Sequence, residues 1–177
     1  MFITAETSIT IDAPANAVWD YASQPVNWTA SNPTEHFGLR FFSPDNLPHA
    51  GVEFDQQESV AGVYANLHGR FHFMDRPHLA FWSGVATYRL AGGLMRVRVP
   101  EGGVLRLEEA EHGVRMTHDV FMQFPDSLWG AFCRWFFVKR LNGPRAVYEH
   151  TYRELVYFKQ KLEAMFAPRA PRKAAAL

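Results

Sequence analysis

The feature that most constrains this chain is a long amphipathic helix predicted near its C-terminal end, over Pro144–Phe166. Apolar residues recur in it at intervals of three and four, which places them on one face of about six helical turns. The turn pair Asn142-Gly143 precedes the helix, Pro144 suits its first turn, and Pro168 ends it. Most of the preceding chain is predicted to form short strands. The apolar face of the helix therefore needs a sheet to cover it.

One strand and two short helices are predicted at the start of the chain. Residues 2–12 alternate between apolar and polar side chains, which is typical of a strand with one buried face. Asp12-Ala13-Pro14 ends that strand and begins a helix. Gln24-Pro25 separates this helix from a second short one, which stops before Asn32-Pro33.

The middle of the chain is predicted to be an antiparallel meander. From His36 onward, turn signals separate segments that alternate or are rich in β-branched and aromatic residues, and we interpret Glu101-Gly102-Gly103 as one of these turns. Residues 114–124 have the clearest alternation. An apolar helix follows, with Asp126 or Ser127 as its N-cap, and leads into the long helix.

The length of 177 residues suits one domain, which we expect over residues 1–167, followed by a flexible Pro/Arg/Ala-rich tail over 168–177. The last four residues of that tail could be a remnant of cloning. Apolar residues make up 47% of the chain, including 15 Phe, which argues against disorder. No apolar run approaches the ~20 residues that span a bilayer. The first residues also lack the pattern of a signal peptide.

Charge and cysteine content limit the expected partners. The net charge is zero, but residues 134–177 hold an excess of Lys and Arg. A solvated helix face with a loose basic tail explains this excess better than duplex binding, which usually needs a strongly basic domain. We therefore expect no nucleic-acid partner, and transient contact with a membrane stays open. The single Cys133 cannot form an internal disulfide, which favours a reducing cytoplasm.

Several segments carry a resemblance to a known superfamily: ITIDAPANAVWDYAS, PVNW, HGVRMTHDV and YRELVYFKQKLE. Over Phe2–Phe166 the chain resembles the START / polyketide cyclase-dehydrase (SRPBCC) superfamily, which includes the birch-pollen-allergen-like proteins. The resemblance implies an α+β helix-grip fold, in which a curved antiparallel sheet of about seven strands wraps around the long C-terminal helix. Two short helices after the first strand close one end. Tyr88–Val99 supplies more strand than this pattern requires, which suggests an added hairpin and leaves the register open between Val85 and Leu107.

The same resemblance implies an internal cavity, because a strongly curved sheet cannot press all its inner side chains against one helix. The candidate lining residues are large apolar side chains on the inward parity of the strands and on one face of the long helix. They are Phe54, Phe71, Phe73, Phe81, Val97, Met116, Val120 and Met122 from the strands, and Tyr148, Tyr152 and Leu155 from the helix. Plain core packing is the alternative role for each of them.

Polar residues on the inward parity are the best candidates for a specific site. His118 lies between Met116 and Val120 on an apolar strand face, where it would orient a ligand or act as a general acid or base. A core histidine bonded to a neighbour is the alternative. Glu58 is the second candidate, for ligand binding or catalysis, unless a one-residue slip places it in solvent.

The sequence indicates no metal or cofactor. His68 and His72 lie four apart on a predicted strand, hence about 13 Å from each other, which is too far to share one ion. No Cys pair or HExxH motif is present, and no glycine-rich phosphate loop follows a strand.

Three classes of function follow from these observations. The favoured one is a carrier or sensor that binds a small hydrophobic or amphipathic molecule, such as a lipid, quinone or polyketide-like compound. The second is a cyclase/dehydrase-like enzyme in which His118 or Glu58 transfers protons. The third is a protein-interaction module with an exposed groove. The identity of the ligand and the oligomeric state stay open, because fold alone does not establish either.

Overall fold

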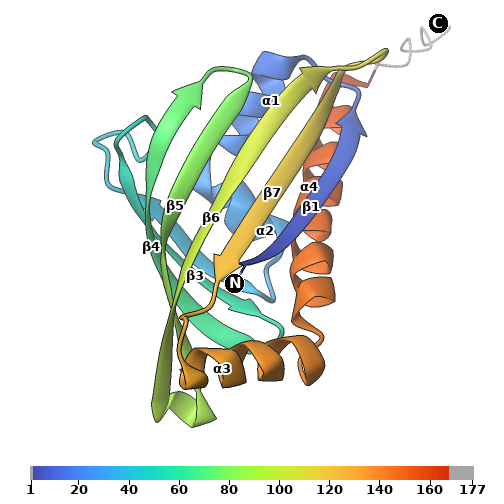
Figure 1. Ribbon diagram of the computed structural model, residues 1–177. Helices are drawn as coiled ribbons and strands as arrows, with labels where there is room; N and C mark the ends of the chain where they lie inside the picture. Colours follow the sequence, from blue (N-terminus) through green and yellow to red (C-terminus); the bar gives the residue numbers. More distant parts are fainter. Residues whose placement is uncertain (1, 168–177) are drawn as a thin grey trace, which may run out of the picture.

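The computed structural model describes residues 2–167, in which a seven-stranded antiparallel sheet curves around a long C-terminal helix (Figure 1). The elements are β1 (Phe2–Ile11), α1 (Ala15–Ala22), α2 (Pro25–Ser31), β2 (His36–Phe41), β3 (Glu53–Val60), β4 (Val63–Asp75), β5 (Leu79–Leu90), a 3-10 turn (Ala91–Gly93), β6 (Met95–Glu109), β7 (Val114–Gln123), α3 (Leu128–Lys139) and α4 (Gly143–Phe166). This confirms the α+β helix-grip architecture with two short helices after the first strand.

The strand order is β1-β7-β6-β5-β4-β3-β2, so β1 and β2 form the two edges of the sheet. The short helices α1 and α2 carry the chain from one edge to the other, across the open side of the curved sheet (Figure 1). Both contact α4. The Phe158 ring of α4 lies 4.7 Å from the Trp28 ring and 5.5 Å from the Tyr21 ring, measured between centroids. The three helices therefore form one apolar layer opposite the sheet.

A residue with a left-handed α backbone conformation lies between the last two helices, α3 and α4. Asn142 has a φ of 50° and precedes α4, while Ser127 caps α3 by accepting a hydrogen bond from the Gly130 N–H at 3.0 Å. The apolar segment after Pro125 and the long helix are thus two helices with different directions (Figure 1). The predicted N-cap at Ser127 is confirmed.

An irregularity in β4 reverses which side chains point inward. Phe71 pairs with Trp82 across the β4–β5 ladder, but the register then shifts, and Phe73 pairs with Phe81. An extra residue in one strand moves the following side chains to the opposite face. Phe73 is consequently 49% exposed and Met74 takes the inward position. The inward prediction for Phe73 is therefore wrong. The inward prediction for Phe81 is wrong for another reason: its β5 neighbours Ala80 and Trp82 line the cavity, so regular alternation turns Phe81 to the opposite face.

The expected turn at Glu101-Gly102-Gly103 lies within a continuous strand. β5 and β6 form one long hairpin, and its tip is the 3-10 turn at Ala91–Gly93. The stretch Tyr88–Val99 is thus the end of two regular strands, not an added hairpin. A Cβ on Gly102 would overlap the Phe121 ring, and one on Gly103 would overlap the Trp82 indole. The two glycines allow close packing of side chains against the sheet, and they do not form a turn.

Within residues 2–167, no helix is both long enough and apolar enough to cross a bilayer. The predicted tail over 168–177 lies outside the described residues.

Candidate functional site

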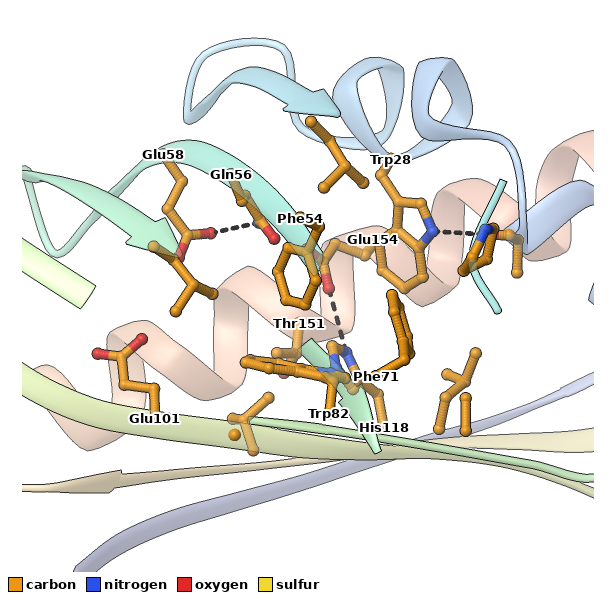
Figure 2. A pocket seen from close by; sticks show the side chains of 18 of the residues that line it. Trp28, Phe54, Gln56, Glu58, Phe71, Trp82, Glu101, His118, Thr151 and Glu154 are labelled. Carbon is orange, nitrogen blue, oxygen red and sulfur yellow. Dashed lines mark hydrogen bonds and ion pairs between the residues drawn. The ribbon is translucent and has the colours of Figure 1, made fainter. Parts of the chain in front are cut away.

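A cavity lies between the concave face of the sheet and α4, with α1 and α2 along one side. Its volume is about 130 Å3, comparable to that of an engineered apolar cavity of about 150 Å3 that binds benzene. Aromatic rings from three neighbouring strands, Phe54, Phe71 and Trp82, face into it (Figure 2). Its polar lining residues are Ser23, Gln56, Glu58, Tyr88, Glu101, His118, His150, Thr151 and Glu154.

The carboxylate of Glu154, which is 2% exposed, is the centre of a buried polar cluster. Its Oε1 lies 3.1 Å from Nε2 of His36 on β2 and 3.3 Å from Nε2 of His150, one turn earlier on α4. Its Oε2 lies 3.4 Å from Nδ1 of His118 on β7 (Figure 2). One carboxylate on the helix therefore contacts side chains from both β2 and β7.

The outer nitrogens of two of these histidines have fixed partners. Nδ1 of His36 lies 2.6 Å from the Trp28 carbonyl oxygen, and Nδ1 of His150 lies 2.7 Å from Oε2 of Glu35. Because both partners are acceptors, each Nδ1 carries a proton and donates it. Glu35 is itself held by the guanidinium of Arg153 at 2.5 Å. The two rings thus present their Nε2 atoms to Glu154.

Burial and charge act against each other in this cluster. Burial lowers the pKa of His150, but hydrogen bonds to Glu154, Glu35 and Glu58 outweigh it and raise that pKa to about 12. Burial raises the pKa of Glu154, but contacts with the histidines hold it well below its usual value. The hydrogen bond from His150 lowers the pKa of Glu35 to about 2. The cluster is therefore charged, with the cationic imidazole of His150 against the ionised carboxylates of Glu35 and Glu154.

A second polar pair lines the cavity at Tyr88 and Glu101. The Tyr88 hydroxyl donates to Oε1 of Glu101 at 2.6 Å. Burial raises the pKa of Glu101 to about 8; the hydrogen bond from Tyr88 opposes this rise, and the charge of Glu58 adds to it. Glu101 is consequently a neutral carboxylic acid at pH 7, with an O–H to donate. Nearby, the Gln56 amide donates to Oε2 of Glu58 at 2.8 Å (Figure 2).

No family model and no curated protein matches the sequence. Solved structures do match. StfQ, a di-domain ARO/CYC protein from the steffimycin biosynthetic pathway, aligns over 95% of this chain and 53% of its own, with a TM-score of 0.63 and 9% identity. A protein from Thermus thermophilus aligns over 92% of this chain and 98% of its own, with a TM-score of 0.62 and 12% identity.

A START superfamily protein from Mycobacterium smegmatis aligns over 92% of this chain and 98% of its own, with a TM-score of 0.58 and 12% identity. The chain has the START-like helix-grip fold. Since these identities are low, the likeness concerns the fold alone.

Six of the sequence-predicted residues line the START-like cavity: Phe54, Glu58, Phe71, His118, Val120 and Met122. Met116 and Leu155 are fully buried in the core beside it, and Val97 lines a smaller second cavity under α3. The inward parity predicted for 114–124 and for Phe54 and Glu58 therefore agrees with the structure.

Tyr148 and Tyr152 do not line the cavity. They are 45% and 41% exposed, and their rings stack on each other with centroids 6.0 Å apart. Successive helical residues are about 100° apart, so the buried face of α4 runs through their neighbours Val147 and Thr151. The 3.6-residue period alone does not show which of two adjacent residues at the border of the apolar face is buried.

Sequence reasoning missed His36, His150, Glu154 and Glu101. His150 and Glu154 are four residues apart on the face of Val147, which is a signal that the helix pattern contains. His36 is 114 residues from His150, and only the fold brings them together. The ligand-type atoms of His36, His150 and Glu154 lie within 4.8 Å of one another, so they are the described residues best placed to hold a metal ion.

Proposed function

We propose that this protein binds a small hydrophobic or amphipathic molecule in the cavity between its sheet and α4. The observation that carries the proposal is the aromatic wall of Phe54, Phe71 and Trp82, which faces unfilled space instead of packing against the helix. Burial of an apolar ligand against these rings supplies the affinity.

Polar groups on two sides of the cavity would orient such a ligand. The protonated Glu101 offers a donor to a carbonyl or ether oxygen. On the opposite side, Nδ1 of His118 and Oε2 of Glu154 form a buried ion pair at 3.4 Å and make no further hydrogen bond within residues 2–167. A ligand hydroxyl beside this long ion pair would offer each atom a hydrogen bond.

The experiment is organic extraction of the purified protein followed by mass spectrometry. A carrier or sensor should release one small molecule in near-stoichiometric amount, and that molecule should rebind to the extracted protein. Recovery of no molecule, together with no binding of a fluorescent apolar probe such as anilinonaphthalene sulfonate, would contradict the proposal.

Glu101 supports a second candidate function, that of a proton-transferring enzyme. A neutral carboxylic acid can protonate a ligand carbonyl oxygen, and His118 or Glu58 would accept a proton elsewhere on the same molecule. Incubation of the extracted molecule and its chemical precursors with wild-type protein and with Glu101→Gln tests this role. Conversion by the wild type alone supports catalysis, and equal conversion by both removes Glu101 from it.

The exposed face of α3 supports transient contact with a membrane, through which ligand would exchange. Leu128 is 94% exposed, and the rings of Trp129, Phe132 and Trp135 are about half exposed on the same helix. The small cavity under α3 shares Tyr88 and Met122 with the main cavity. An aromatic helix over this route is placed to insert at the headgroup level of a bilayer.

A further inference from the structure

We propose that His36, His150 and Glu154 form a binding site for a divalent transition-metal ion of the zinc class, with Glu58 as a fourth ligand. The site goes beyond the proposed function, because it stands whether or not the cavity holds an apolar molecule. The inference rests on the distances between the ligand atoms and on the partners of the outer nitrogens.

The three central atoms already have the spacing of ligands around one ion. Nε2 of His36 lies 2.9 Å from Nε2 of His150 and 3.1 Å from Oε1 of Glu154, and the third separation, between His150 and Glu154, is 3.3 Å. Ligands of a tetrahedral zinc ion with bonds of about 2.0–2.1 Å are roughly 3.3 Å apart. An ion can therefore lie about 2 Å from all three atoms with little movement of the side chains.

The carboxylate of Glu58 lies close to the two imidazole ligands. Its Oε2 lies 3.7 Å from Nε2 of His36 and 3.5 Å from Nε2 of His150. Glu58 and His36 are paired residues of β3 and β2, so the sheet register fixes their relation. The Gln56 amide holds the Glu58 carboxylate at 2.8 Å. The ligands thus come from β2, β3 and α4, which are rigid elements.

The partners of the imidazoles match those of metal-binding histidines. Such histidines donate their second N–H to a backbone carbonyl or a carboxylate. His36 does so to the Trp28 carbonyl and His150 does so to Glu35. With each Nδ1 proton held in this way, an ion that displaces the Nε2 protons meets two lone pairs that converge with two carboxylate oxygens. A divalent ion then supplies two positive charges at one point.

A second buried contact lies beside the cluster. Oε2 of Glu154 and Nδ1 of His118 form an ion pair at 3.4 Å and make no further hydrogen bond among the described residues. Glu154 is 2% exposed and His118 is 7% exposed, so bulk solvent does not compensate for them. Glu58, His150 and Glu154 also line the cavity, which gives an ion a path to the site.

The donor set selects the class of metal. Two imidazoles with two carboxylates suit zinc, cobalt, nickel or iron, whereas magnesium and calcium prefer oxygen ligands alone. The probes are therefore Zn2+ and Co2+, added to protein that has been stripped with a chelator. Calorimetry gives affinity and stoichiometry for Zn2+, and the visible absorption of Co2+ reports a tetrahedral site.

We expect one equivalent of Zn2+ to bind and Co2+ to show intense tetrahedral bands. His36→Gln, His150→Gln and Glu58→Gln should each lower the affinity by about 100-fold or more, and Glu35→Gln, which changes only the positioning partner of His150, by about 10-fold. His72→Gln is the matched control, because that ring is exposed and bonded to Ser83, away from the cluster.

Three results would overturn the site. They are no uptake of either ion by stripped wild-type protein, uptake without tetrahedral Co2+ bands, and unchanged affinity in the Glu58→Gln and His150→Gln variants. If a variant fails to fold by circular dichroism, the Co2+ spectrum of the wild type decides. Failure of ligand extraction would leave these readouts unaffected, so the two proposals are tested separately.

Discussion

The Tyr88 hydroxyl donates a hydrogen bond to the Glu101 carboxyl at 2.6 Å inside the cavity, with both side chains buried. This pair places an acid on β6 that stays protonated at neutral pH, because burial raises the pKa of Glu101 to about 8. The START-like cavity therefore has a neutral donor on its sheet side and a charged cluster on its helix side.

The first prediction concerns stability against pH. The pKa of Glu101 rises from 4.5 to about 8 on folding, so the folded state holds the proton more tightly than the unfolded state. Its contribution is complete below pH 4.5 and is lost as pH rises through 8, by up to about 1.4 kcal/mol per pH unit. Glu101→Gln should remove this decline from the free energy of unfolding measured by urea denaturation.

The control for that experiment is Glu109→Gln, which changes an exposed carboxylate on the same strand. It should retain the wild-type pH profile. The pKa of Glu101 limits the decline to the range between about pH 4.5 and 8. If the free energy of unfolding of Glu101→Gln falls as steeply in this range as that of the wild type, another group causes the decline.

Phe158 is expected to be the main apolar anchor of α4. Its side chain is fully buried and its ring contacts Trp28 and Tyr21. Phe158→Ala should lower the free energy of unfolding by about 3–5 kcal/mol, because it leaves a cavity between the helices. Phe166→Ala, at a 48% exposed position on the same helix, should cost far less. Equal losses would mean that the helices do not pack as described.

Gly102 tests the close packing within the sheet. A Cβ there would overlap the Phe121 ring and the Trp82 carbonyl oxygen, so Gly102→Ala should destabilise the fold by about 1–3 kcal/mol. Gly38→Ala is the control, because nothing lies within 4 Å of its added Cβ. The melting temperature of each variant gives the comparison. A neutral Gly102→Ala would indicate that these strands adjust freely.

The exposed aromatic face of α3 should bind anionic vesicles. Lys139 and Arg140 at the end of α3 add electrostatic attraction, so binding should weaken with salt. Co-sedimentation of Trp129→Ser/Phe132→Ser should fall several-fold, while Phe37→Ser, at a 52% exposed ring on β2, should behave like the wild type. If vesicles bind none of these proteins, the α3 face is better explained by a protein partner.

Local patterns in the sequence predict the elements well, and they fail where distant segments combine. The 3.6-residue period defines α4, and the two-residue period places His118 and Glu58 inward. The bulge in β4 has no such local signal, and it reverses Phe73. The contact between His36 and His150 forms because the sheet curves back to the helix. Neither the helix period nor the strand period carries information about that curvature.

Titration of an apolar probe into two matched variants tests the central claim, that the cavity is a binding site, most directly. Val120 lines the cavity, so Val120→Trp fills space that a ligand would use. Val26→Trp is the matched control, because Val26 is 67% exposed on α2. We predict that Val120→Trp weakens binding of anilinonaphthalene sulfonate and of the extracted molecule by at least about 10-fold, which corresponds to about 1.4 kcal/mol, and that Val26→Trp binds like the wild type. Equal affinity in both folded variants would contradict a ligand site in this cavity.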